Sequence, residues 1–165
     1  MTGLREQQKK KRRAGMLTAA KTLFAKRGYE SVKLEEIAKE AEVSPGTLYN
    51  TFETKNDLLL AVIVEDFEHG FAEGRKVLDG PLTDALSAVN DLCRCHYYRH
   101  AEGPSNEMWR FAIAAHTSRP GSLFAREYQQ CLSGIRGQIS VLLTRLKREG
   151  HLPHQADTEE LAYLI

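Results

Sequence analysis

The chain has 165 residues, of which 42% are hydrophobic and 27% are charged, and these values are typical of a globular protein with one substantial core or two small ones. No apolar run approaches the length of a transmembrane helix, and residues 1–13 lack the apolar stretch of a secretory signal, so we expect a cytoplasmic protein without a membrane partner. The three cysteines are an odd number without disulfide-framework spacing, and we expect them to be free thiols.

The formal net charge of +1 is unevenly distributed. Residues 1–55 contain 12 Lys and Arg against 7 Asp and Glu, a balance of +5, whereas residues 56–165 contain 11 against 15, a balance of −4. This asymmetry indicates that the N-terminal part binds a polyanion. Most of the excess lies in residues 9–13, and two interpretations of residues 1–13 stay open: a solvated, disordered tail, or a flexible basic arm that reaches along DNA.

The first predicted helix carries Leu17, Ala20 and Phe24 at helical spacing. Gly28 is expected to end it, with Tyr29 making the hydrophobic contact that often closes such a helix end. Ser31 is expected to cap the second helix.

The second and third predicted helices have the pattern of a helix-turn-helix. An apolar stripe begins at Leu34 and ends at Ala41, and after a short break Ser44 can cap a further helix in which Pro45 suits the first position. Gly46 leaves one side of the first turn bare. A bare, capped helix start can approach another molecule closely, as a recognition helix does in the major groove of DNA.

The fourth predicted helix begins at a capping box between Thr54 and Asp57, and its apolar stripe continues without a breaker to Phe71. Helical spacing recurs after it and alternation typical of strands is nowhere sustained, so the predicted fold is all-α. Four more helices are expected, over residues 82–96, 108–115, 124–146 (ended by Gly150) and from 157 onward. Since no stop signal closes the apolar residues 161–165, we expect that last helix to continue natively beyond the sequence shown.

The string VSPGTLYNTFETKNDLL at residues 43–59, together with the three helices of residues 14–60, resembles the DNA-binding domain of TetR family transcriptional regulators. The resemblance implies a basic arm at 1–13, a three-helix DNA-binding domain at 14–55, and a larger helical domain at 56–165 that binds an inducer and dimerises. In this family helices eight and nine usually form the dimer interface. The eighth would begin near Asp157 and the ninth would be absent, so we expect the dimerisation helices to be incomplete.

The helix-turn-helix pattern and the resemblance together assign the DNA contacts. Lys55 lies at a helix start, where the dipole disfavours a cation unless an anion lies between them, so we expect it to hold a phosphate. Tyr49 matches a phosphate-contacting tyrosine of the family, and Thr47 and Asn50 are candidates for base edges. The complete set of predicted DNA contacts is Lys33, Ser44, Pro45, Gly46, Thr47, Tyr49, Asn50, Thr51 and Lys55.

Three residues depart from the common family pattern. Lys33 stands in place of a threonine, Thr51 in place of histidine or another larger polar residue, and Glu42 in place of a glycine in the turn between the two helices. A carboxylate is repelled by DNA, and a residue with a Cβ can be strained where glycine is usual, so Glu42 puts the geometry of this turn in question.

Several side chains with polar ends lie among apolar residues in the larger domain, a composition that suits a small-molecule pocket between helices. Aromatic residues at helical spacing, however, more often form part of the core. The candidate ligand contacts are Cys93, His96, Tyr97, His100, Trp109, Phe111, His116 and Tyr128. Cys93 and His96 share a helix face, which leaves a thiolate metal site as a weaker alternative.

These patterns predict a ligand-responsive regulator, most simply a repressor, that binds a palindromic operator as a homodimer and is released by a small-molecule inducer. No catalytic motif is present, so we expect no enzyme activity, no cofactor and no metal. Two other functions stay open: a helical metal- or thiol-dependent enzyme with an appended DNA-binding domain, and a constitutive DNA-organising protein without a ligand.

Overall fold

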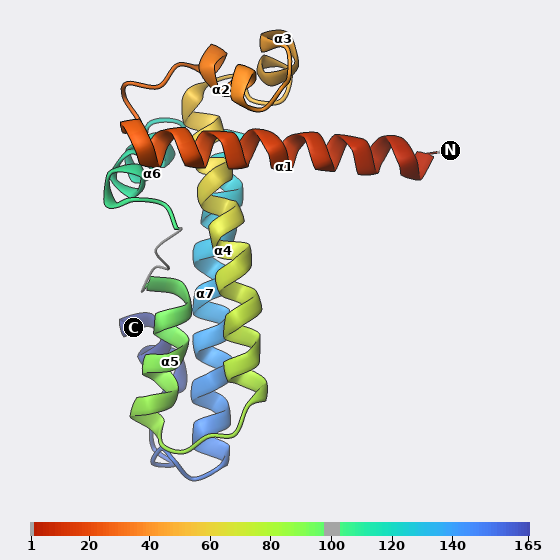
Figure 1. The fold of residues 1–165 in the computed structure, drawn as a ribbon. Helices are drawn as coiled ribbons and strands as arrows, with labels where there is room; N and C mark the ends of the chain where they lie inside the picture. Colours follow the sequence, from red (N-terminus) through yellow and green to blue (C-terminus); the bar gives the residue numbers. More distant parts are fainter. Residues whose placement is uncertain (1, 98–102) are drawn as a thin grey trace. The chain divides into compact units, whose positions relative to one another are not determined.

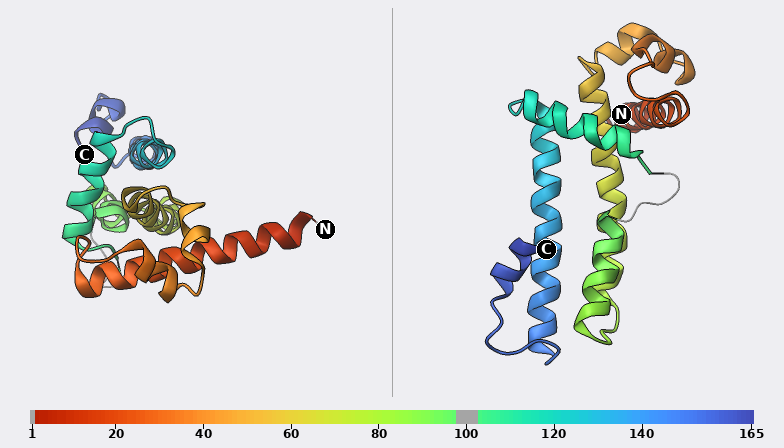
Figure 2. Two further views of the ribbon diagram at one scale, coloured as in Figure 1. Left: turned by 90° about the horizontal axis from the view of Figure 1, so that it is seen from above. Right: turned by 90° about the vertical axis from the view of Figure 1, so that its left-hand side faces the viewer.

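The structure is a computed structural model that describes residues 2–97 and 103–165. Within those ranges the chain forms eight α-helices and no strand, which confirms the all-α prediction (Figures 1 and 2). The helices are α1 (Thr2–Arg27), α2 (Leu34–Glu40), α3 (Pro45–Tyr49), α4 (Lys55–Asp79), α5 (Ala85–Tyr97), α6 (Asn106–Ser118), α7 (Leu123–Arg148) and α8 (Thr158–Leu164). They divide into two compact units, one made of Met1–Glu65 with Pro104–Tyr128 and the other of Asp66–Gly103 with Gln129–Ile165.

The basic N-terminal segment is helical, because α1 already begins at Thr2 and continues for 26 residues to Arg27 (Figure 1). The expectation of a disordered tail or flexible arm is therefore wrong. Residues 4–13 contain only leucine, arginine, glutamate, glutamine and lysine, all of which favour helices. Forming the first turn of a helix is the unfavourable step, and the buried turns at Met16–Phe24 provide it. Extending the helix from there toward the N-terminus through the charged residues then costs little free energy.

Local end signals act largely as the sequence indicates. Gly28 ends α1 with a positive φ of 80°, and Tyr29 is buried behind it. At the start of α3, the Ser44 hydroxyl accepts a hydrogen bond from the Thr47 backbone amide at 3.1 Å. At the start of α4, Asp57 Oδ2 accepts the amide of Thr54 at 3.1 Å, while Thr54 Oγ1 accepts the amide of Asp57 at 3.1 Å, which confirms the capping box.

Ser31 does not cap α2, so that prediction is wrong. Its hydroxyl instead donates to the carbonyl oxygen of Arg27 at 2.6 Å and so satisfies the last turn of α1. Lys33 is the N-cap residue of α2, and its backbone amide donates to Glu36 Oε2 at 2.8 Å. Glu36 also forms an ion pair with Arg27 at 2.7 Å, so one carboxylate serves both the start of α2 and the end of α1.

The first unit is closed by polar contacts around the loop between α1 and α2. Lys55 Nζ donates to the carbonyl oxygens of Tyr29, Glu30 and Val32 at 2.7, 3.0 and 2.9 Å. The ammonium also lies 4.4 Å from the centre of the Tyr29 ring, and the Tyr29 hydroxyl donates to Asn56 Oδ1 at 2.6 Å. Burial, and then the nearby charge of Asp57, raise the pKa of Tyr29 to about 12, so this phenol stays a hydrogen-bond donor at neutral pH.

Helix α6 packs on this same unit. The ring of Phe111 lies 4.7 Å from that of Tyr29, and Arg119 at the end of α6 approaches Asp57 at 3.8 Å and Glu53 at 3.8 Å. Residues after position 104 therefore contact both the α1–α2 loop and the start of α4.

The second unit is held by close approaches between α4, α5 and α7. A Cβ on Gly70 would lie 2.8 Å from the carbonyl oxygen of Cys95, and one on Gly134 would lie 2.8 Å from the Phe71 ring, so these helices touch where only glycine fits. His96 Nε2 is 2.8 Å from Gln138 Oε1, and the Gln138 amide donates to the Phe71 carbonyl oxygen at 3.1 Å. Burial lowers the pKa of His96, so the ring is neutral at physiological pH.

None of the helices in the described ranges is both long and apolar enough to cross a membrane. Cys93, Cys95 and Cys131 all lie within the described residues, and none of them forms a disulfide.

Glu42 adopts the strained backbone anticipated from its departure from glycine, with φ = 55°. Its amide donates to the Lys39 carbonyl oxygen at 3.1 Å, so the turn keeps a hydrogen-bonded end for α2 despite the Cβ. Positive φ at a residue with a side chain costs about 1 kcal/mol or more.

We predict that Glu42→Gly stabilises the protein by about 0.5–1 kcal/mol, because glycine adopts this φ without strain and the gain exceeds its entropic cost. Denaturant unfolding measures the change. Glu42→Ala is the control, since it removes the carboxylate but keeps the Cβ. Equal stabilisation by alanine would assign the effect to charge and contradict the strain.

Candidate nucleic-acid interface

Helix α3 and the residues at its two ends carry seven of the nine predicted DNA contacts. Leu48 and Phe52 are fully buried and anchor the helix, whereas Tyr49 and Asn50 are exposed and Thr47 and Thr51 are half-buried. Ser44, Pro45 and Gly46 form the exposed helix start. A short helix with a buried apolar side and an uncharged polar outer side can enter a groove and contact base edges.

The hydroxyl groups on this surface are partly committed to the helix itself. Ser44 Oγ and Thr47 Oγ1 lie 2.8 Å apart, and Thr51 Oγ1 donates to the Thr47 carbonyl oxygen at 3.1 Å. The backbone amide of Asn50 donates to the Gly46 carbonyl oxygen at 3.0 Å, but its side-chain amide forms no hydrogen bond with the residues that the structure describes. Asn50 is therefore the polar side chain on this surface best placed to hydrogen-bond an added partner.

Tyr49 is held by an acidic residue that the sequence analysis did not single out. Its hydroxyl donates to Glu35 Oε1 at 2.8 Å, which links α3 to the first turn of α2. This hydrogen bond lowers the pKa of Glu35 and raises that of Tyr49, so at neutral pH the pair is a carboxylate and a phenol. A phosphate that approaches Tyr49 must replace Glu35 as the acceptor and meet its negative charge.

The two predicted cationic contacts differ in what surrounds them. Lys33 is exposed at the start of α2. The Lys55 ammonium has three N–H groups, and the carbonyl oxygens of the α1–α2 loop accept all three. A phosphate bond from Lys55 would require one of these contacts to open. Its phosphate role stays a prediction, while its contact with the loop is the role that the structure displays.

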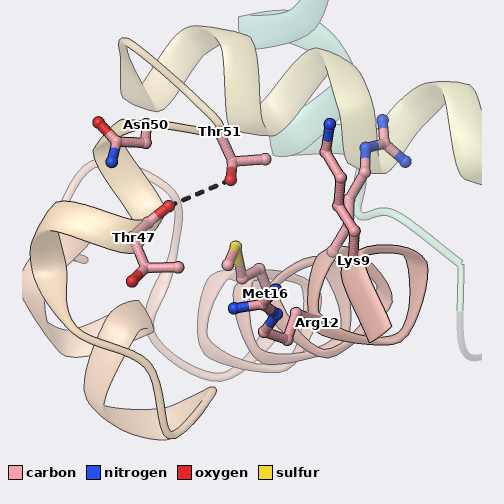
Figure 3. Close-up of a pocket in the computed structure, with 7 residues that line it drawn as sticks. Lys9, Arg12, Met16, Thr47, Asn50 and Thr51 are labelled. Carbon is pink, nitrogen blue, oxygen red and sulfur yellow. Dashed lines mark hydrogen bonds between the residues drawn. The ribbon is translucent and has the colours of Figure 1, made fainter. Parts of the chain in front are cut away.

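A cleft of about 380 Å³ separates α3 from the N-terminal half of α1 (Figure 3). One wall is basic and comes from α1, and the other is polar and comes from the end of the helix-turn-helix. The residues that line it are Lys9, Arg12, Arg13, Met16, Thr47, Asn50 and Thr51. The four α1 residues that line the cleft are spaced three, four and seven positions apart, which places them on one face of a helix. The sequence reveals this basic face only if residues 1–13 are assigned to a helix.

The predicted ligand contacts do not gather in one compact unit. Trp109, Phe111, His116 and Tyr128 belong to the unit that contains the helix-turn-helix, whereas Cys93 and His96 belong to the other. The Tyr128 ring lies 5.1 Å from the His116 ring and 6.4 Å from the Trp109 ring, and the buried His116 Nδ1 has no hydrogen-bond partner among the described residues. The side chain of Tyr97, and His100 as a whole, lie outside the described residues.

The weaker metal-site alternative finds no ligand set in the structure. Among the described residues, no three His, Cys, Asp or Glu side chains converge on a common point. Burial raises the pKa of Cys93, which keeps its thiol protonated.

The comparison with known families concerns the helix-turn-helix segment. Residues 16–62, which contain α2, α3 and the capped start of α4, match the family model described as bacterial regulatory proteins, tetR family. This segment, 47 of the 165 residues, is therefore similar to the DNA-binding domain of the TetR family. Similar proteins include the Escherichia coli regulator UidR, 37% identical over 68 residues, and the Rhodococcus jostii transcriptional repressor KstR, 38% identical over 66 residues.

These matches cover 41% and 40% of the chain but only 35% and 31% of the relatives, so the matched segment spans about a third of their length. The similarity in fold extends beyond the segment that matches in sequence. The transcriptional regulator FadR of Bacillus subtilis, solved in complex with stearoyl-CoA, superposes with a TM-score of 0.64 at 20% identity, covering 92% of this chain and 79% of that one.

We predict that Glu35→Gln strengthens binding to a random-sequence duplex several-fold and steepens its salt dependence, because one carboxylate leaves the surface while an amide oxygen still accepts the Tyr49 hydroxyl. Fluorescence anisotropy at several salt concentrations measures both. Glu40→Gln, on the same helix and without a Tyr49 contact, is the control. Weaker binding of Glu35→Gln would show that the carboxylate positions Tyr49 for DNA instead of opposing it.

Proposed function

We propose that this protein is a DNA-binding transcriptional regulator of the TetR family and that its helix α3 reads an operator in the major groove. The observation that carries the proposal is the exposed, Ser44-capped and uncharged outer side of α3, anchored by Leu48 and Phe52 within a segment that matches the family model. Tyr49 and Lys33 would contact phosphates, and Thr47 and Asn50 would contact base edges. Ser44, Pro45, Gly46, Thr51 and Lys55 complete the proposed surface.

The proposed regulator acts as a homodimer on a palindromic operator, with its two α3 helices about one helical turn, roughly 34–36 Å, apart. Repression is supported by the relative KstR, which is named a transcriptional repressor. The proposed organisation keeps residues 14–55 as the DNA-binding domain and 56–165 as the domain for ligand and dimer contacts. The proposed location is the cytoplasm, and the proposed activity is regulatory, without catalysis.

Release by a small molecule is the second part of the proposal, and α6 supports it. Trp109 and His116 lie on α6, and Phe111 of the same helix contacts Tyr29, whose backbone oxygen accepts Lys55. A ligand among the α6 side chains would move Phe111 and the loop behind α2 together. Because α4 starts at Lys55, its orientation would change with that loop, and so would the spacing of two reading helices.

We predict that the protein enriches one palindromic sequence from a random oligonucleotide pool and prefers it over random DNA by about a thousandfold or more. Thr47→Ala and Asn50→Ala should change the preferred bases, because they remove groups on the reading surface. Glu30→Gln, exposed in the α1–α2 loop, is the control and should keep the preference. Sequence-indifferent binding by the unaltered protein would favour a DNA-organising role and contradict this one.

We predict that Phe111→Leu changes affinity for the enriched duplex several-fold with little change in salt dependence, because it loosens the ring contact with Tyr29 and not a phosphate contact. Anisotropy titrations measure both quantities. Ile113→Leu, at an exposed position of the same helix, is the matched control. If folded Phe111→Leu binds the duplex with unchanged affinity, α6 does not couple ligand binding to DNA binding.

A further inference from the structure

The cleft beside α3 is strongly basic and has no acidic wall. Three of its seven lining side chains are cationic and none is a carboxylate. In the part of the chain that the structure describes, neither Lys9 nor Arg12 forms an ion pair, and both are exposed. Arg13 is half-buried, 5.9 Å from the centre of the Phe52 ring. The uncompensated charge favours an anion here.

The basic wall is ordered before anything binds. Lys9, Arg12, Arg13 and Met16 repeat at helical spacing, so α1 holds their side chains on one face, and the buried Met16 fixes that face against the unit (Figure 3). A flexible arm would lose backbone freedom on binding, whereas a helix has already lost it on folding. The adjoining Lys10 and Lys11 do not line the cleft.

The opposite wall identifies the anion. Thr47, Asn50 and Thr51 belong to the proposed reading surface, so a duplex read by α3 brings its sugar-phosphate backbone to the edge of the same surface. We propose that this cleft is a binding site for one backbone phosphate of the duplex that α3 reads, with Lys9 and Arg12 of α1 as its cationic contacts. The inference rests on the proposed function and adds α1 to the elements that hold DNA.

A charge-matched pair of variants tests the site. Lys9→Gln/Arg12→Gln removes two charges from the cleft face, and Lys10→Gln/Lys11→Gln removes two from elsewhere on the same helix. All four positions are exposed and glutamine keeps helix propensity, so circular dichroism should show both variants folded. On random-sequence duplex, the first variant should reduce the slope of log K against log salt by about 1, and the second by clearly less.

Neutral phosphate analogues locate the contact. Duplexes of the enriched sequence, each with a single methylphosphonate, are bound to all three proteins. For the unaltered protein and for Lys10→Gln/Lys11→Gln, one position flanking the α3 contact should cost about tenfold in affinity, as expected for a lost charge-assisted contact. For Lys9→Gln/Arg12→Gln the same substitution should cost less than about twofold, because the partner charge is already gone.

Equal costs in all three proteins at every position would overturn the cleft contact and leave only general attraction between α1 and DNA. Saturable binding of inorganic phosphate alone, abolished in Lys9→Gln/Arg12→Gln without any methylphosphonate coupling, would also overturn it and identify a free-anion site. Failure of the proposed function has a separate signature, because the unaltered protein would then bind the enriched duplex no better than random DNA.

Discussion

The contact between Lys55 and the α1–α2 loop is the constraint on which the first unit depends. The three carbonyl oxygens of Tyr29, Glu30 and Val32 lie just after a helix end, where backbone acceptors lack helical partners. One ammonium donates to all three, and burial lowers the pKa of Lys55. Since Lys55 is also the first residue of α4, the contact fixes where α4 begins relative to the loop that precedes α2.

These hydrogen bonds from Lys55 explain how α3 keeps its position although it buries few side chains. Its five residues provide one fully buried side chain, Leu48, and the adjacent Phe52 provides another. Helices of this length are not stable alone, so their position must come from the surrounding structure. With the loop, the capping box at Thr54 and the Tyr49–Glu35 hydrogen bond holding the flanks, the outer side of α3 needs no apolar residues and is left for recognition.

Sequence reasoning succeeded where the deciding interaction is local. The Ser44 cap, the Gly28 and Gly150 helix ends, the Asp57 capping box and the positive φ of Glu42 each involve residues within a few positions. It did not anticipate contacts with distant partners: Lys55 donates to carbonyl groups 23 to 26 positions away, and Tyr49 donates to Glu35, 14 positions away. Ser31 was misassigned because a hydroxyl between two helices can serve either, and the open Arg27 carbonyl was its partner.

The arrangement of charge separates two tasks that DNA recognition combines. Helix α3 contains no charged residue, so it can discriminate base edges but adds little to the attraction between protein and duplex. The cations lie on α1 and at Lys33, while Glu35 opposes phosphate beside Tyr49. Under the proposed function, affinity rests largely on the α1 cations and Lys33, which make no sequence-specific contact, and Glu35 weakens binding to every duplex alike. A surface built this way gains its preference for one sequence from the few polar groups of α3, because the electrostatic contribution is the same for all competing sites.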